Sequence, residues 1–280
     1  MNSATAPRRM TLCADDYGLS PGINRAILEL IGLRRINAAS VMTVAPAFDR
    51  EQALSLQRAA DQTGCQIGLH LTLTAPFRPL TMQVRPLHGN SFLPLSKLLI
   101  ASLTRRLDRK ILRAEIAAQL AAFKAAFGRV PDYADGHQHV QVFPQIREAF
   151  VDAVADAAPN AWVRQCGRAP GARRSVGDLK SLTLDILSAG LRRRAKRAGV
   201  SFNPAFAGAY DFSRQPDFAA VFEGFLQGLP DGGLVMCHPG FVDDTLIALD
   251  PLTTQRERER EFLAGDRLPE LLAARNMALA

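Results

Sequence analysis

The chain has 280 residues, of which 34 are Lys or Arg and 27 are Asp or Glu, and its formal net charge is +7. Hydrophobic residues make up 48%, enough for a sizeable core, whereas aromatic residues make up only 7% and are not interleaved with the basic runs, which argues against single-stranded nucleic acid as a partner. No apolar run reaches the ~18 residues of a membrane span, and the N-terminus lacks the apolar segment of a secretion signal. We therefore expect a cytoplasmic protein that does not bind nucleic acid.

The cysteines stand singly and far apart, at Cys13, Cys65, Cys166 and Cys237. Because none belongs to a Cys-x-x-Cys pair, a zinc ribbon is excluded. Cys13 and Cys237 lie within apolar runs, where cysteine usually serves as a small buried hydrophobic residue. The pattern indicates reduced, structural thiols, as in a cytoplasmic protein.

The first structural unit reads as strand, polar loop and helix. Residues 1–9 are expected to form a disordered tail, and residues 10–14 to form a buried strand. The helix over residues 23–35 places apolar side chains on one face at helical spacing. Ser20 followed by Pro21 is typical of an N-cap with proline in the first helical position.

The alternation of strands and helices continues along the chain. Further strands are predicted at 38–46, 65–74, 132–143, 160–167, 200–208 and 232–241. Helices are predicted at 48–64, at 95–127 with a basic interruption over 105–110, and at 144–158, 179–199 and 217–229, with a charged and an apolar helix after Thr253. Residues 75–94 are rich in proline and read as a long functional loop.

Strictly alternating elements of this kind predict parallel strands connected by crossover helices. Six or seven strands suit a distorted or incomplete (β/α) TIM-like barrel better than an open dinucleotide-binding sheet, and no glycine-rich phosphate loop follows the first strand. With no clear linker or internal repeat, we expect a single domain over residues 1–280.

Acidic and imidazole side chains gather where the predicted strands end, which is where parallel α/β folds place their sites. Asp15 and Asp16 close the first strand, His70 lies on the third and His238 closes the last. Adjacent carboxylates are costly to hold ionised unless a cation lies between them. A divalent metal site is therefore one interpretation of the aspartate pair, and an N-cap or Asx turn is the other. For His70 alone, a hydrogen-bonded core histidine is the alternative.

The segment DGHQHVQ carries Asp135, His137, His139 and Gln141 at every second position. In a strand these side chains would share one face and could supply a metal ligand, an orienting carboxylate and a substrate contact. A polar strand face toward solvent is the alternative. His238, before Pro and Gly, could be a general acid or simply a turn residue.

One aspartate and two histidines would leave positions of a metal ion open for water and substrate. Such a triad is typical of hydrolysis by a metal-activated water, and also of iron oxygenation.

Four motifs, ADDYGLSPGIN, GLHLTLT, DGHQHVQVFPQI and MCHPGF, resemble in order and spacing those of the YdjC-like carbohydrate deacetylases. The resemblance runs from about Thr11 to Phe241. It implies a distorted (β/α) barrel that uses one divalent metal ion to remove N-acetyl groups from an amino sugar, with the metal-activated water attacking the acetamide.

The resemblance also assigns roles. It implies Asp16, His70 and His137 as metal ligands and Asp15 as catalytic base. His238 is implied as catalytic acid or oxyanion stabiliser. His139 is implied as a pocket residue that contacts substrate, and we expect the same of Arg164, at the start of a basic stretch. Many relatives carry histidine where this chain has Gln141, which cannot relay a proton near neutral pH.

The loop and the C-terminal LTTQREREREFL resemble a branch associated with hopanoid biosynthesis, which implies a lipid-linked amino-sugar substrate. The basic helix Leu179–Arg197 could then rest on the inner membrane, or could pack on the barrel with its basic end in solvent. Mg or Zn is expected as the metal, and a monomer or homodimer as the assembly. The rival functions are another metal-dependent hydrolase, such as a phosphodiesterase, and a metal- or sugar-binding protein without turnover.

Overall fold

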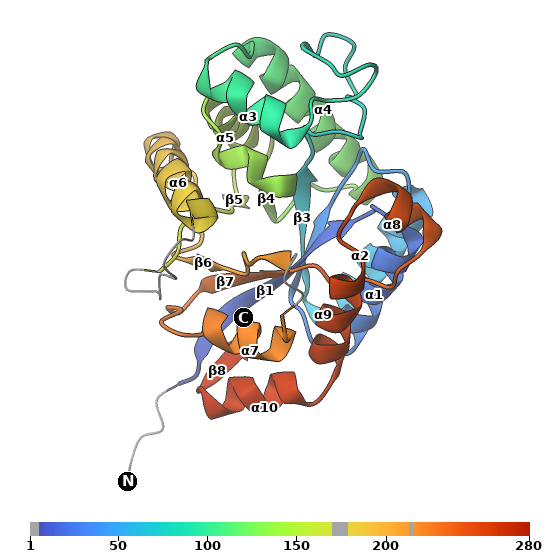
Figure 1. The fold of residues 1–280 in the computed structure, drawn as a ribbon, viewed down its shortest axis with the longest axis vertical. Helices are drawn as coiled ribbons and strands as arrows, with labels where there is room; N and C mark the ends of the chain where they lie inside the picture. Colours follow the sequence, from blue (N-terminus) through green and yellow to red (C-terminus); the bar gives the residue numbers. More distant parts are fainter. Residues whose placement is uncertain (1–5, 170–178, 213–215) are drawn as a thin grey trace.

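The computed structural model describes residues 6–169, 179–212 and 216–280. Its centre is a curled parallel sheet of eight strands in the order β5-β4-β3-β2-β1-β7-β6, with β8 paired to β1 (Figure 1). The strands are β1 (Arg8–Tyr17), β2 (Ala38–Val41), β3 (Gln66–Leu71), β4 (Tyr133–Gly136), β5 (Trp162–Val163), β6 (Phe206–Ala207), β7 (Gly233–Cys237) and β8 (Met277–Leu279). All residues of β2 and β7 are buried, so the core lies on both sides of the central strands.

Helices surround the sheet. They are α1 (Pro21–Gly32), α2 (Arg50–Thr63), α3 (Leu95–Leu103), α4 (Arg109–Phe127), α5 (Ile146–Ala157), α6 (Leu179–Ala198), α7 (Phe218–Phe225), α8 (Asp244–Leu249), α9 (Thr254–Ala264) and α10 (Arg267–Ala274), with a 3-10 segment η1 (His137–Val142) after β4. The parallel order with crossover helices confirms the predicted α/β class. Among the α-helices of the described residues, only α8 has no counterpart among the predicted helices.

The sheet curls into an incomplete barrel, as predicted. Its two end strands, β5 and β6, do not pair with each other. The described residues around them are linked by one parallel bridge, Val163 to Phe202, and by the hydrogen bond from Phe206 N to Gly167 O (3.0 Å). The Asn203 side chain adds two more links, since it accepts from Gln165 N (2.8 Å) and donates to Gln165 O (3.1 Å). Both end strands are shorter than predicted. Pro204 has no N–H to donate, which explains why the strand expected at 200–208 shrinks to two residues.

The first and last strands, β1 and β8, lie beside each other, which the sequence did not indicate. Arg8 and Arg9, predicted as part of a disordered tail, belong to β1 and pair with Met277 and Ala278 of β8. Residues at the end of the chain, expected to continue a helix, form this strand instead. Arg8 and Arg9 are therefore not part of a tail, because their pairing partner is supplied from the other end of the chain; residues 1–5 of the predicted tail lie outside the described residues.

The predicted helix signals are confirmed where they were strongest. Ser20 accepts a hydrogen bond from Ile23 N at 3.3 Å, and Pro21 is the first residue of α1. The basic interruption within 95–127 separates α3 from α4, and Asp108 caps α4 through the amides of its first turn. These signals are local, so they survive whatever the tertiary context is.

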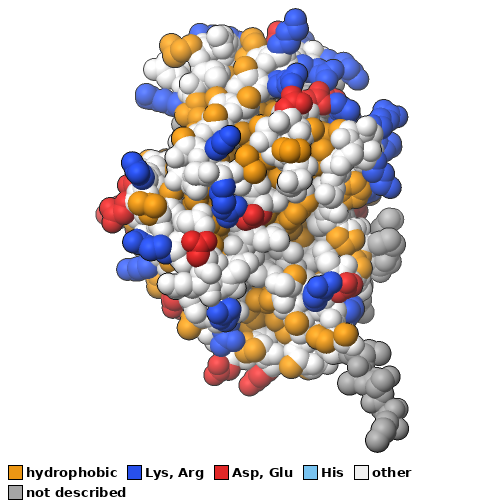
Figure 2. All heavy atoms as spheres, turned by 180° about the vertical axis from the view of Figure 1, so that it is seen from behind, with side chains coloured by type: hydrophobic (Ala, Val, Ile, Leu, Met, Phe, Trp, Pro, Cys, Tyr) orange, Lys and Arg blue, Asp and Glu red, His pale blue; other side chains and the backbone are white. Residues whose placement is uncertain are grey.

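The helix α6 packs on the protein through its apolar side. Leu184, Leu187, Leu191 and Ala195 are buried, and α6 lies beside α5 (Figure 1). Much of the apolar face suggested for a bilayer is thus covered by the protein, as in the alternative of a helix packed on the barrel, whereas Leu182 and Ile186 are exposed (41% and 65%). None of the described helices is both long and apolar enough to cross a bilayer. On the face in Figure 2, Lys and Arg side chains are spread out, with Asp, Glu and hydrophobic side chains between them.

Candidate active site

The last residues of β1 form an irregular end that turns Asp16 toward the neighbouring strands. The pairing of β1 with β2 shifts register between Ala14 and Tyr17, as in a β-bulge. Asp16 sits in this shift with a φ of 73°, a left-handed conformation that aspartate tolerates better than most residues. The bulge therefore re-aims one carboxylate of the Asp15–Asp16 pair while its neighbour stays in the strand.

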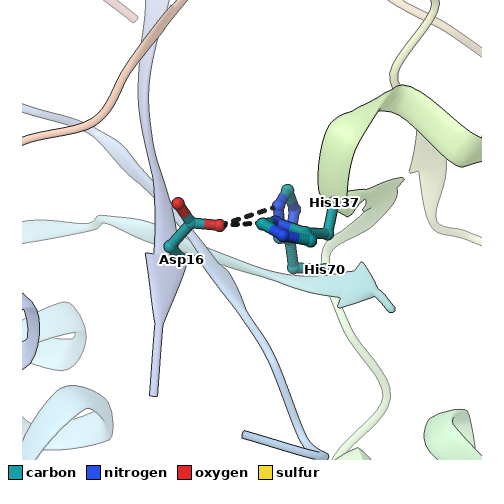
Figure 3. Close-up of side chains that lie close together, drawn as sticks. All are labelled: Asp16, His70 and His137. Carbon is teal, nitrogen blue, oxygen red and sulfur yellow. Dashed lines mark hydrogen bonds and ion pairs between the residues drawn. The ribbon is translucent and has the colours of Figure 1, made fainter. Parts of the chain in front are cut away.

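Asp16 meets two imidazoles at the carboxyl edge of the sheet (Figure 3). Its Oδ1 lies 2.9 Å from His137 Nδ1 and 3.3 Å from His70 Nε2. One ligand atom from each of the three residues lies within 4.8 Å of the others, and all three residues are buried. The structure thus brings together the three residues that the sequence motifs imply as metal ligands.

His70 is oriented from behind by Asp135. Asp135 pairs with His70 in the β3–β4 register, and its Oδ1 lies 2.6 Å from His70 Nδ1, which leaves Nε2 facing Asp16. Ser40 donates to the other oxygen of Asp135 at 2.6 Å. This carboxylate–histidine arrangement is typical of metal ligands and confirms the expectation of an orienting carboxylate in the DGHQHVQ segment.

The strand carrying DGHQHVQ ends earlier than predicted, and this separates its two histidines. β4 stops at Gly136, and Gln138 and His139 adopt left-handed backbone conformations within η1 (φ 54° and 60°). The expectation that Asp135, His137 and His139 share one strand face was therefore wrong. His137 points to Asp16, whereas His139 Nδ1 lies 3.6 Å from Cys166 Sγ, and the His139 ring contacts Phe206 edge-on.

His139 remains close to the site as a neutral group. Burial, followed by the nearby Arg164 guanidinium, lowers the pKa of His139 to about 3. Gln141, also on η1, donates weakly to Arg164 O at 3.3 Å, while its Oε1 is buried without a hydrogen-bond partner. Both side chains contact residues that follow β5, namely Arg164 and Cys166, and neither joins the Asp16 cluster.

Arg164 is completely buried and ties the first strand to the fourth. Its Nη1 and Nη2 donate to Asp15 Oδ2 and Oδ1, both at 2.6 Å, and Nη2 also lies 2.6 Å from Asp135 Oδ2. Its expected contact with substrate stays a prediction, because in this state the side chain has no exposed surface. What the geometry shows directly is that Arg164 fixes the orientation of Asp15 and Asp135 together.

This ion pair sets the charge state of Asp15. Burial would raise the pKa of Asp15, but the Arg164 guanidinium and the nearby His70 outweigh it and hold that pKa well below its usual range. Asp15 is therefore ionised at neutral pH. For Asp16, burial likewise opposes ionisation, and Arg256 and His137 together hold its pKa low.

Arg256 of α9 is a site residue that the sequence did not reveal. It is buried, and its Nη2 donates to Asp16 Oδ2 at 2.7 Å and to Asp250 Oδ2 at 2.9 Å. With Oδ2 held in this way, Oδ1 is the oxygen of Asp16 that remains for a cation. In the sequence, Arg256 stands within QREREREF, which reads as a solvent-exposed charged helix, so no local signal marked it.

Glu259, one turn further along α9, supports the loop that carries His238. Its Oε2 accepts from the backbone N–H of His238 at 2.6 Å, and its Oε1 accepts from Tyr210 Oη at 2.5 Å. Burial raises the pKa of Glu259 to about 7, although both hydrogen bonds oppose this. Burial also lowers the pKa of His238 to about 4, so its imidazole is neutral at neutral pH.

The segment after β3 forms one wall of the site. The Phe77 ring meets the His137 ring edge-on with centroids 5.9 Å apart. The buried carboxylate of Glu115 on α4 accepts from Leu80 N (3.0 Å) and from both Thr81 N and Thr81 Oγ1 (2.8 Å each). This carboxylate fixes the start of the loop beside the imidazoles.

The donor set suits a divalent cation. Two imidazole nitrogens and one carboxylate oxygen, backed by Asp135 and Arg256, form a facial triad, and such a triad leaves coordination positions open for water and substrate. A second group, Cys13, Asp15 and Asp135, also lies close together, but the Arg164 guanidinium already occupies it. The first group is therefore the candidate metal centre.

Fold and site together define an incomplete parallel (β/α) barrel with a buried Asp–His–His cluster at its carboxyl edge. The chain belongs to the YdjC-like protein family, whose sequence model matches residues 9–274.

Two solved structures share this architecture. A protein from Enterococcus faecalis V583, provisionally described as a cellobiose-phosphate cleavage protein, has 20% identity and a TM-score of 0.73 over 98% of this chain and 97% of its own. A lactam utilization protein from Thermus thermophilus has 14% identity and a TM-score of 0.52 over 97% of this chain and 98% of its own. At these identities the likeness establishes the fold.

Proposed function

We propose that this protein is a divalent-metal-dependent hydrolase that removes N-acetyl groups from an amino sugar. The observation that carries the proposal is the Asp16–His70–His137 cluster, with an ionised carboxylate, Asp15, on the adjacent residue of the same strand. Membership of the YdjC-like family and the resemblance of its four motifs to carbohydrate deacetylases support the substrate class.

The residues present fit a metal with affinity for imidazole. Asp16 Oδ1, His70 Nε2 and His137 Nδ1 would hold it, and two nitrogen donors favour a transition metal such as Zn over Mg, which prefers oxygen ligands. When bound, the cation would supply Lewis-acid polarisation of the acetamide carbonyl and of the attacking water.

The protein's own groups would move the protons. Asp15 is ionised and held by both oxygens to Arg164, so it can accept the proton of the attacking water. His238 would pass a proton to the departing nitrogen. Because the His238 imidazole is neutral before the reaction, His238 must take up this proton during turnover. The attacking water releases one proton and the departing nitrogen gains one, so the number of protons balances.

The surrounding side chains would position the sugar. Phe77 offers an apolar surface against His137, and His139 lies at the β6 side of the same edge. We propose these two residues as contacts for the N-acetyl sugar. A lipid carrier on that sugar fits the resemblance to the hopanoid-associated branch.

Acetate release tests the proposal directly. The purified protein, stripped of metal and reloaded from a panel of Mg, Zn, Co and Ni, is incubated with N-acetylglucosamine, chitobiose and an N-acetylglucosaminyl lipid. We expect metal-dependent acetate release from at least one of them. Phosphate release from phosphodiesters without acetate release would establish the rival hydrolase, and recovery of every sugar unchanged would establish a binding protein.

A further inference from the structure

A long insertion between β3 and α4 stands out by its charge. Residues 75–107, here named the β3–α4 insertion, contain no Asp or Glu. They contain five basic residues, all exposed: Arg78, Arg85, Lys97, Arg105 and Arg106. Elsewhere in the described chain many arginines pair with carboxylates, as Arg129 does with Asp132. The β3–α4 insertion is thus a region of one charge sign.

The same insertion exposes large apolar side chains. Met82 is 88% exposed, Ile100 59% and Leu103 56%, and Leu80 and Leu95 are also exposed. These are half of the ten large hydrophobic residues that the structure exposes in its described part. Apolar surface gathered in one segment, unlike single scattered residues, marks an interaction site.

The helix α3 within the insertion is apolar on two sides. Leu98 and Ala101 are buried against the protein, whereas Leu95, Ile100 and Leu103 face outward. Lys97 is its only charged residue. A helix that is hydrophobic all round is normally buried on all sides. The outer side of α3 is instead exposed, although its apolar residues are typical of a side that packs against another apolar surface.

The position of the insertion connects this surface to the candidate active site. It emerges from β3, which carries His70, and its Phe77 packs against His137. Figure 1 shows the loop and α3 together at the end of the molecule opposite α10. Glu115 accepts hydrogen bonds from the backbone of Leu80 and Thr81, so the backbone at the start of the loop is held in place.

We propose that the β3–α4 insertion is a docking surface for an anionic lipid bilayer. Its outward apolar side chains would enter the boundary between headgroups and acyl chains, and its cations would lie among acidic headgroups, as on interfacial amphipathic helices. The absence of acidic residues over residues 75–107 favours an anionic lipid surface over a protein partner of mixed charge. Such docking would place at the membrane the segment whose Phe77 contacts His137, whatever reaction the site carries out.

Vesicle co-sedimentation of the full chain tests this without any substrate. We expect binding to phosphatidylcholine vesicles that contain phosphatidylglycerol, little binding to pure phosphatidylcholine, and a decrease as NaCl is raised. Lys97→Glu with Arg106→Glu should lower the partition coefficient by at least about 25-fold, since each cation near such a surface is worth about fivefold. Ile100→Ser with Leu103→Ser should lower it by about tenfold or more per side chain.

Matched variants on other surfaces distinguish the insertion from general basicity. Arg193→Glu with Lys196→Glu changes two exposed cations of α6, and Leu54→Ser with Ile247→Ser changes two exposed apolar residues of α2 and α8. We expect both pairs to bind vesicles as the unchanged protein does. The proposal is overturned if the unchanged protein does not co-sediment with anionic vesicles or if the control pairs lose binding equally. It is also overturned if, within the insertion, only the charge reversals lower the binding.

Discussion

Asp15 and Arg164, 149 positions apart in the chain, meet in a buried two-pronged ion pair with both N···O distances at 2.6 Å. This pair separates the roles of the adjacent aspartates: Asp15 is held by an arginine, and Asp16 faces two imidazoles. It also predicts how the two residues respond differently to substitution.

Asp15→Asn should abolish most turnover while leaving metal binding intact. The amide cannot accept a proton from water, and removal of a general base typically costs 10²–10⁴-fold in rate. Acetate release, together with metal content measured after dialysis, checks this. The matched control is Asp16→Asn, which should lose metal as well as activity. Near-normal turnover in Asp15→Asn would show that another group is the base.

Arg164→Lys should move the acid limb of the pH–rate profile to higher pH. The guanidinium holds the pKa of Asp15 low against the effect of burial, so a lysine that cannot grip both oxygens would let that pKa rise. Asp15 must be ionised to act, and activity would then fall away at a higher pH than in the unchanged protein. A profile of unchanged shape with only a lower plateau would contradict the tuning role.

Metal affinity should increase with pH. Burial opposes protonation of His70, but Asp135 and Asp15 prevail and raise its pKa to about 10 in the metal-free protein. Binding must therefore displace a proton, which predicts about a tenfold gain in apparent affinity per pH unit below that value. Competition with a chromophoric chelator at several pH values measures the slope. Asp135→Asn should flatten the slope and weaken binding by about 10–100-fold.

Arg256→Lys should weaken metal binding through Asp16. Lysine retains the charge but cannot hold Asp16 and Asp250 in the same fixed fork, so Asp16 would lose its set orientation. We expect roughly a 10–100-fold higher dissociation constant for the metal. Arg260→Lys is the matched control on the same helix, where the arginine pairs with the partly exposed Glu29. Equal effects of the two substitutions would indicate general loosening of α9.

Glu259→Gln should remove a pH dependence of stability. Burial raises the pKa of Glu259 from 4.5 to about 7 in the folded protein, so the folded state binds a proton that the unfolded state has released. Proton binding by Glu259 therefore adds to the free energy of unfolding. This contribution is fully present below about pH 4.5 and is lost as the pH rises through about 7. Glutamine can still accept from His238 N and donate to Tyr210, so the variant should be relatively more stable at pH 8.

Urea unfolding at pH 5 and pH 8 measures this difference. Glu261→Gln, at an exposed position of the same helix, is the control and should follow the unchanged protein at both pH values. If Glu259→Gln kept the same pH dependence as the unchanged protein, the proton uptake would belong to another group.

The sequence by itself determined the alternating parallel architecture, the N-cap of α1 at Ser20, and the placement of Asp16 and His70 in the candidate metal centre. These features depend on hydrogen bonding and side-chain periodicity over a few residues, or on motifs that carry their own spacing. Local patterns and motifs of this kind can be read directly from the linear sequence.

Only the tertiary structure decided which histidine of DGHQHVQ faces Asp16, because a left-handed turn ends the strand at Gly136 and breaks the alternation. It also supplied the partners that fix the site. Arg256 reaches Asp16 across 240 positions, from a helix whose sequence reads as solvent-exposed. A buried ion pair between distant segments leaves no periodic trace in either one, since each charge is compatible with solvent until the fold removes the water around it.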